Sequence, residues 1–158
     1  MRGKKAKIRT IGTDPKFDSL LVAKVINRVM VSGKKTIAQR HVYQALEEAA
    51  KKTKKEPLIV LGEAIANIKP QMEVRPRRIG GAAYQIPVPV SSRRQDSLAI
   101  RWLIEAARSR PNKEFHTFTE KLTAEIVDAT KNEGLAIKKK EDTHKMAEAN
   151  KAFSHFRW

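Results

Sequence analysis

Residues 73–90 read EVRPRRIGGAAYQIPVPV, and this stretch decides the fold class. Two runs that contain β-branched and aromatic residues flank Gly80-Gly81, a dipeptide that suits the tight turn of a hairpin. The segment 72–90 is therefore predicted to form a β-hairpin. Its three prolines have no N–H to donate to a neighbouring strand, so the hairpin is expected to be isolated or at a sheet edge and to protrude.

Side chains alternate between the two faces of a hairpin, so the register about the two glycines predicts which residues share a face. One face combines arginines with an aromatic ring, and its members are Arg75, Arg77, Ile79, Ala82, Tyr84 and Ile86. Arg78 lies on the opposite face. A narrow ribbon with basic groups on both faces suits a nucleic-acid groove, and Tyr84 is available for stacking on a base. The alternative is a solvated edge hairpin whose arginines only add solubility.

Apolar residues before and after the hairpin recur at the spacing of amphipathic helices. Three helices are expected before the hairpin: the first runs from Phe17 to Gly33, the second begins at a capping box formed by Thr36 and Gln39, and the third begins at Pro57 and stops before Pro70. Three more are expected after it: the fourth is capped by Ser91 or Ser92 and ends at Pro111, the fifth covers residues 115–129, and the sixth follows Gly134.

The predicted fold is mainly α: a bundle of about six helices with one protruding β-hairpin between the third and fourth helices. We expect a single domain over residues 14–158, which is a length that buries one ordinary core. Residues 1–13 contain five basic residues, no acid and no apolar period, so they are expected to form a flexible basic arm.

The charge balance is the first evidence about a partner. The chain has 33 Lys and Arg against 17 Asp and Glu, a net charge of +16, which favours a polyanion such as nucleic acid. A membrane surface is the rival polyanion, but no apolar stretch is long enough to span a bilayer. The absence of cysteine fits a reducing compartment, so a cytoplasmic location and no membrane partner are expected.

The predicted fourth helix carries a basic stripe. Arg94, Arg101 and Arg108 recur every seven residues, with Arg93 at the start of the helix and Arg110 just past its end. An ordinary solvated face remains a strong alternative, because Glu105 can pair with Arg101 or Arg108. Trp102, spaced with apolar neighbours on this helix, is expected in the core.

Two further lysine groups differ in their expected role. Lys34 and Lys35 lie in the turn before the second helix, where the amides of the helix start also favour an anion. Lys138, Lys139 and Lys140 have acidic neighbours, which favours a solvated face for them.

No pattern points to catalysis, to a metal or to a cofactor. The four histidines, His41, His116, His144 and His155, lack metal-binding spacing, so structural or surface roles are expected for them. No phosphate-binding loop, zinc-protease motif or nucleophile elbow occurs, and the protein is predicted not to be an enzyme.

Four separated segments occur in an order that carries a resemblance. They are INRVMVSGKK at 26–35, the hairpin sequence at 73–90, RR..SLAIRWL...AR.R from Arg93 and KKKEDTHKMAEANKAFSHFRW at 138–158. Together they resemble the family of small-subunit ribosomal protein seven, in its bacterial or organellar form. The resemblance covers nearly the whole chain and implies the same fold that periodicity predicts.

The resemblance implies a structural constituent of the ribosome that binds the 3′ major domain of small-subunit (16S-type) rRNA and nucleates assembly of the head. It also implies exit-site tRNA, the platform and ribosomal protein eleven as neighbours, and a monomer within the ribosome. The rRNA-binding candidates are Arg2, Lys4, Lys5, Lys7, Arg9, Lys34, Lys35, Arg75, Arg77, Arg78, Arg93, Arg94, Arg101, Arg108, Arg110 and Lys113. The candidates near tRNA and the platform are Gly80, Gly81, Ala82 and Tyr84.

Two prolines depart from the family pattern. Relatives commonly have a small polar or basic residue where Pro76 stands and an acid where Pro89 stands, so the ladder and local charge of the hairpin differ here.

Two other function classes compete with a ribosomal role. A DNA-packaging or regulatory protein would need a dimer with two-fold-related arms. An RNA-modifying enzyme has only the basic surface in its favour.

Overall fold

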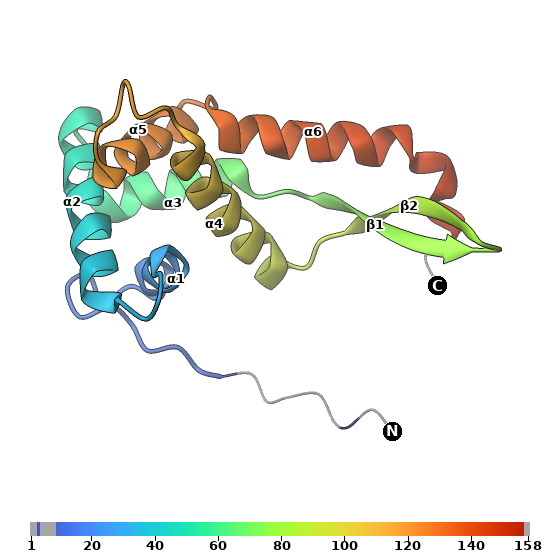
Figure 1. Cartoon of the computed structure of the whole chain (residues 1–158), viewed down its shortest axis with the longest axis horizontal. Coiled ribbons are helices and arrows are strands. Elements are labelled where there is room, and N and C mark those ends of the chain that lie inside the picture. Colours follow the sequence, from blue (N-terminus) through green and yellow to red (C-terminus); the bar gives the residue numbers. More distant parts are fainter. Residues whose placement is uncertain (1–2, 4–8, 157–158) are drawn as a thin grey trace.

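The computed structural model describes residue 3 and residues 9–156. Within them the elements are α1 (Leu20–Val29), α2 (Lys35–Thr53), α3 (Pro57–Ile68), β1 (Met72–Ile79), β2 (Ala82–Pro89), α4 (Ser92–Ser109), α5 (Phe118–Thr130), α6 (Leu135–Ala149) and the 3-10 helix η1 (Lys151–Phe156). A mainly helical chain with one hairpin between α3 and α4 confirms the predicted fold class (Figure 1).

The first helix is shorter than predicted. It begins at Leu20, because Phe17 belongs to a turn held by the Asp14 carboxylate, which accepts hydrogen bonds from the backbone N–H groups of Lys16 and Phe17. The same carboxylate accepts a hydrogen bond from the hydroxyl of Tyr43 at 2.6 Å. Burial and this bond to Asp14 raise the pKa of Tyr43 to about 12, so the turn is anchored to α2 by a phenol that stays protonated.

The capping box predicted at Thr36 is wrong. The chain enters α2 directly from a turn with positive φ at Gly33, so Lys34 takes the N-cap position and Thr36 already lies inside the helix. The structure places a capping box on α5 instead. There the Thr117 hydroxyl accepts from the backbone N–H of Glu120, and the Glu120 carboxylate accepts from that of Thr117.

The core lies among the first five helices. Leu61, Ile65, Leu103, Leu122 and Ile126, which come from α3, α4 and α5, are all at most 1% exposed. Trp102 is buried in the same cluster, as predicted. Burial of these apolar side chains supplies the main stabilisation of the bundle.

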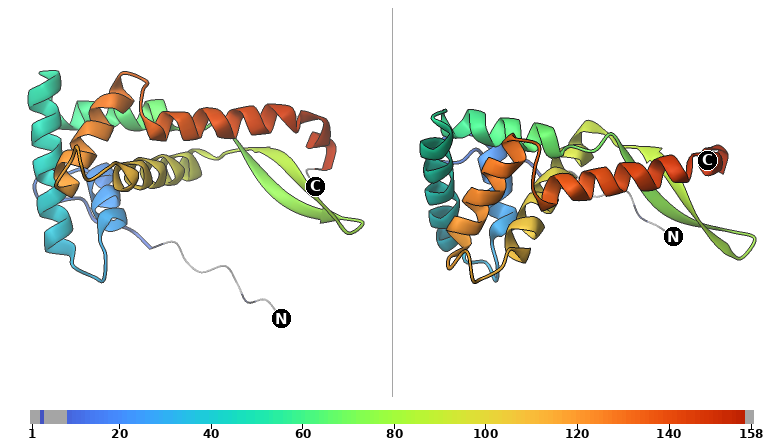
Figure 2. Two further views of the ribbon diagram at one scale, coloured as in Figure 1. Left: turned by 45° about the horizontal axis from the view of Figure 1, so that its top comes forward. Right: turned by 90° about the horizontal axis from the view of Figure 1, so that it is seen from above.

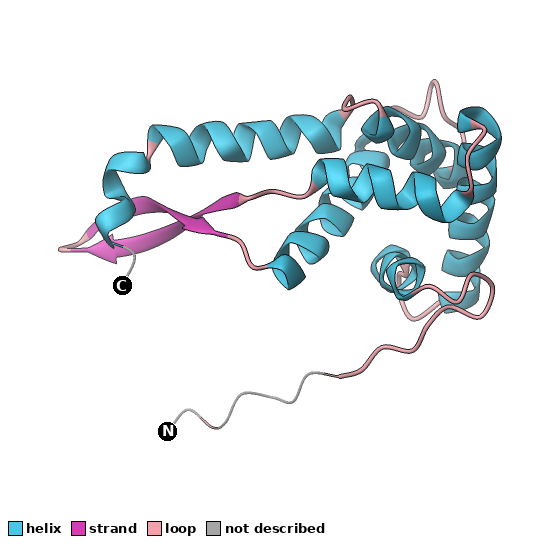
Figure 3. Ribbon diagram, turned by 180° about the vertical axis from the view of Figure 1, so that it is seen from behind, coloured by secondary structure: helices cyan, strands magenta, loops and turns pink. Residues whose placement is uncertain are grey.

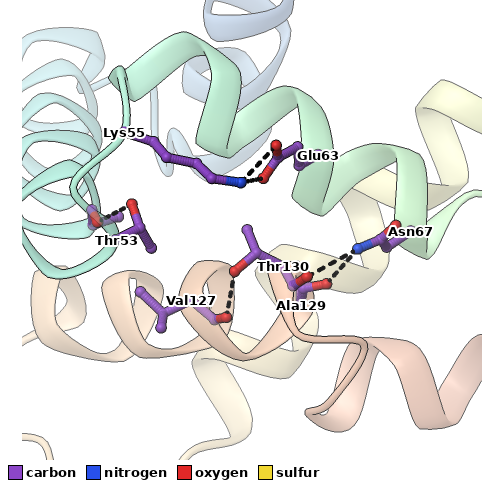
Figure 4. A network of polar contacts seen from close by, with 8 residues as sticks. Thr53, Lys55, Glu63, Asn67, Val127, Ala129 and Thr130 are labelled. Carbon is purple, nitrogen blue, oxygen red and sulfur yellow. Dashed lines mark hydrogen bonds and ion pairs between the residues drawn. The ribbon is translucent and has the colours of Figure 1, made fainter.

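A polar network ties α5 to its neighbours at the edge of this core (Figure 4). The last carbonyls of a helix have no partner within the helix. The side chain of Asn67 on α3 donates to the carbonyl oxygens of Ala129 and Thr130 in the last turn of α5. Lys55 also binds Glu63 across the entry to α3. The network therefore satisfies the end of α5 and fixes its position against α3.

The two strands pair as the sequence predicts. The antiparallel register joins Arg75 to Ile86, Arg77 to Tyr84 and Arg78 to Ala83. Within the described residues the sheet consists of these two strands, and it projects from the bundle as expected (Figure 1). The hairpin twists along its length, and its tip reaches beyond η1 (Figure 2).

The hairpin does not stand alone, however. In Figure 3, α6 leaves the bundle beside the strands and η1 folds back onto them. Contacts join α6 to both strands and η1 to β2. The hairpin, α6 and η1 therefore form one projecting unit, which the weak apolar stripe of α6 did not reveal.

Candidate nucleic-acid interface

The three hairpin arginines lie exposed on β1. Arg75 and Arg77 share one face of the ribbon and Arg78 lies on the other, as their strand positions require. Arg75 shares the carboxylate of Glu73 with Arg94, which lies in the first turn of α4. The base of the hairpin and the start of α4 thus form one basic surface, although they are 21 positions apart in the sequence.

The hairpin tip is backbone-rich and open. Gly80 and Gly81 have φ of +55° and +90°, the left-handed conformations that a tight hairpin turn requires, and Ala82 beside them is exposed. Tyr84 differs from expectation. Its ring centroid lies 5.2 Å from that of Phe153 and 5.9 Å from that of Phe156, so η1 already packs on the ring that the sequence left free for a base.

A basic groove of about 320 Å³ lies between α1 and α4. Its basic lining consists of Lys24, Arg28, Arg93 and Arg101. Lys24 and Arg28 were not predicted as binding residues, although their i, i+4 spacing puts them on one face of α1. Cations from both helices can therefore bind the same phosphate groups in this groove.

Asp96 is the one carboxylate lining this basic groove, among the described residues. Lys69 lies 2.7 Å and Lys24 3.5 Å from its oxygens. Burial alone would raise the pKa of Asp96, but the hydrogen bonds and charges of Lys69 and Lys24 outweigh it and lower that pKa. Asp96 is therefore ionised, and it orders the lysines while it removes part of the positive charge.

Arg108 and Lys34 line a second pocket, near the end of α1. Arg108 donates to the carbonyl oxygen of Val29 at 3.1 Å, so one of its roles is to bind the last turn of α1. Lys34 and Lys35 are exposed at the start of α2, and their own backbone N–H groups already donate to the carbonyl oxygens of Val31 and Gly33. The anion-binding role of this turn stays a prediction.

Arg110 has a structural role that the sequence did not show. Its side chain is only 13% exposed, and it binds the carboxylates of Glu125 and Asp128 on α5. Burial alone would lower the pKa of Arg110, but the hydrogen bonds to Asp128 and Glu125 raise it. These ion pairs give Arg110 a structural role, and its contact with RNA stays a prediction. Lys113, in the loop that follows, is exposed.

Glu105 does not neutralise the α4 stripe as the alternative interpretation proposed. It pairs with Lys139 on α6 at 2.8 Å and lies 3.9 Å from Arg28. Arg101 is exposed in the basic groove. The pairing of Lys139 agrees with the solvated-face role expected for the lysines of α6.

Most of the basic residues predicted in the N-terminal arm have no described position. Arg2, Lys4, Lys5 and Lys7, with most of the predicted arm, lie outside the described residues, whereas Arg9 is described and exposed. Within residue 3 and residues 9–156, no three His, Asp or Glu side chains gather into a set that could hold a metal ion. Over the same residues, no helix combines the length and the apolarity needed to cross a bilayer.

Comparison with known proteins agrees with the resemblance in the sequence. A family model described as ribosomal protein S7p/S5e matches residues 1–151. The small ribosomal subunit protein uS7 of Thermotoga maritima is 56% identical over 158 residues, which is 100% of both chains. The uS7 protein of Thermosipho africanus is 54% identical over the same full length. That of Caldicellulosiruptor saccharolyticus is 57% identical over 152 residues, or 96% of each chain.

A family model over nearly the whole chain, together with full-length relatives above 50% identity, shows the family directly. The chain therefore belongs to the ribosomal protein S7p/S5e family, a family of structural ribosomal proteins and not of enzymes.

Proposed function

We propose that this chain is a structural protein of the small ribosomal subunit that binds the 3′ major domain of 16S-type rRNA and nucleates assembly of the head. In this role it acts as a monomer, without a cofactor, in the cytoplasmic ribosome. The observation that carries the proposal is that the groove between α1 and α4 contains Arg93, while the adjacent Arg94 is joined through Glu73 to Arg75 of the hairpin. Family membership supports the ribosomal assignment.

The surface suits RNA backbone for a physical reason. Arginine guanidiniums form forked hydrogen bonds with phosphate, and the groove presents cations from two helices to one strand. The proposed contacts are Arg9, Lys34, Lys35, Arg75, Arg77, Arg78, Arg93, Arg94, Arg101, Arg108 and Lys113, together with Arg2, Lys4, Lys5 and Lys7. Lys24 and Arg28 join this set.

The hairpin tip has a second proposed environment. Gly80, Gly81 and Ala82 present backbone groups with little side-chain bulk, which allows close approach of another macromolecule. We place exit-site tRNA and the platform, including ribosomal protein eleven, beside this tip. Tyr84 would contribute through the surface it shares with η1 and not as a free stacking ring.

The test is crosslinking in cell extract followed by sequencing of the attached RNA. Enrichment of the 3′ major domain of 16S-type rRNA is the expected result. A binding assay with transcripts of that domain, of another rRNA domain and of duplex DNA gives the affinities and their salt dependence. Equal affinity for all three would refute the proposal, and a two-fold dimer in light scattering would favour a DNA-binding role instead.

The hairpin provides a matched pair of variants for this assay. Arg75→Ala combined with Arg77→Ala is expected to weaken rRNA binding by roughly a hundredfold or more, since each charge-assisted phosphate contact contributes about 1.5–3 kcal/mol. Lys139→Ala removes a cation of α6 that is paired with Glu105 on α4, so it should have little effect on rRNA binding. A large loss of melting temperature in the double variant would mean that these arginines hold the fold.

A further inference from the structure

Glu73 is a buried carboxylate between two arginines of the basic surface. Its side chain is 8% exposed, whereas those of Arg75 and Arg94 are 53% and 46% exposed. One oxygen of Glu73 lies 2.5 Å from the Nε and from an Nη of Arg75. The other oxygen accepts from the Nε of Arg94 at 2.6 Å. Each oxygen of the carboxylate therefore holds a different guanidinium.

This arrangement joins two parts of the fold. Arg75 belongs to β1 and Arg94 to the first turn of α4, and the hairpin leaves the bundle at this junction (Figure 1). A long, flexible arginine side chain loses rotamer freedom when it binds a ligand, and that loss weakens binding. An arginine that is already held by an acid in the free protein has lost part of that freedom before the ligand arrives.

We propose that Glu73 is a positioning residue, which holds Arg75 and Arg94 in the free protein as a preformed two-arginine site for the phosphate backbone of rRNA. The inference rests on the proposed function and deepens it. Glu73 itself does not touch RNA, because a carboxylate repels phosphate and its side chain is buried. It acts only through the two guanidiniums.

Positioning by Glu73 and net charge predict opposite changes in RNA affinity when Glu73 is replaced. Glu73→Gln raises the net charge from +16 to +17, so attraction to RNA alone would strengthen binding. Positioning has the opposite effect, because a glutamine offers one acceptor oxygen and cannot hold two guanidiniums as a carboxylate does. The sign of the change in affinity therefore separates the two explanations.

The experiment measures binding of the full chain to a transcript of the 16S-type 3′ major domain over a range of salt concentrations. Glu73→Gln is expected to bind roughly tenfold more weakly, from the ordering cost of two arginine side chains. The slope of log affinity against log salt should stay nearly unchanged, because both arginines still reach phosphate and only their ordering costs more. Glu63→Gln is the control, since it makes the same charge change at an acid that binds Lys55 outside the basic surface.

Two more measurements separate positioning from folding. Added to a chain that already carries Arg75→Ala and Arg94→Ala, Glu73→Gln should cause no further loss of affinity. In NMR spectra of the free wild-type chain, the Nε–H signals of Arg75 and Arg94 should exchange with water more slowly than that of the exposed Arg93. The NMR measurement needs no substitution at Glu73, so it remains decisive if that variant fails to fold.

The outcomes distinguish this inference from the proposed function. Unchanged or tighter binding by Glu73→Gln, or Nε–H exchange as fast as that of Arg93, would overturn the positioning role and leave the rRNA-binding role intact. If the wild-type chain does not prefer the rRNA transcript over duplex DNA, the proposed function fails and the inference fails with it.

Discussion

Replacing Arg110 by alanine tests the structural role that its ion pairs with α5 indicate. Arg110 Nε donates to the Glu125 carboxylate at 2.8 Å, and the same guanidinium binds Asp128. Glu125 is 0% exposed and also accepts from the backbone N–H of Ala136 at 2.9 Å. The three side chains therefore tie the end of α4, α5 and the start of α6 together.

The expected cost follows from what the variant leaves behind. Without Arg110, the fully buried carboxylate of Glu125 keeps a single backbone donor among the described contacts. Removing one partner of a buried ion pair costs about 3–5 kcal/mol, and the partly exposed Asp128 adds little. A domain has about 5–15 kcal/mol of stability in total. At about 2–4 °C per kcal/mol for a chain of this size, the melting temperature should fall by about 6–20 °C.

Thermal and urea denaturation of Arg110→Ala and of Arg93→Ala provide the measurement and its control. Arg93 is exposed in the basic groove, so its removal should change stability by less than about 0.5 kcal/mol. Its removal should weaken RNA binding instead. The reasoning is refuted if Arg110→Ala melts like Arg93→Ala and loses RNA affinity, because Arg110 would then be an RNA ligand and not a structural residue.

Three further expectations concern the turn into α6, the base of the hairpin and its tip. Gly134→Ala should lower stability by about 1–3 kcal/mol in urea denaturation, because φ is +96° and a Cβ would lie 2.9 Å from a Glu125 oxygen; an unchanged midpoint would contradict this. Burial lowers the pKa of His144, whose Nε2 accepts a hydrogen bond from the Gln71 N–H. The contribution of His144 to stability is therefore fully present above its ordinary pKa of 6.5 and is lost as pH falls through the lower pKa of the folded state. His144→Gln should flatten this dependence of stability on pH, and an identical dependence would refute it. Phe153→Ala should remove about 0.5–1.5 kcal/mol of local ring packing and speed hydrogen exchange in β2, which equal rates would exclude.

The hairpin was predictable in detail because its signals are local. Two adjacent glycines set the turn, and a period of two then assigns every side chain of Met72–Ile79 to a face, as the observed register confirms. Pro57 and Pro70 marked the limits of α3 for an equally local reason. The start of α1 was missed because the turn at Asp14 imitates the spacing of a helix.

The partners of the arginines were not predictable, because they come from other elements. Arg93 and Arg110 look alike in the sequence, as basic residues at opposite ends of one helix. Only the packing of α5 brings two carboxylates to Arg110 and leaves Arg93 in an open groove. The covering of Tyr84 by η1 is likewise a contact between distant segments, and no pattern within the hairpin announces it.

The acids of this basic chain therefore act in three ways that a net charge of +16 conceals. Glu125 is buried with Arg110 and removes that cation from the surface, so it contributes to folding. Glu105 pairs at the surface with Lys139, and such an exposed pair contributes little. Glu73 is buried but leaves both of its guanidiniums about half exposed. Because only cations that reach phosphate release counterions, the salt dependence of RNA binding should follow the exposed arginines and lysines, not the total of 33 basic residues.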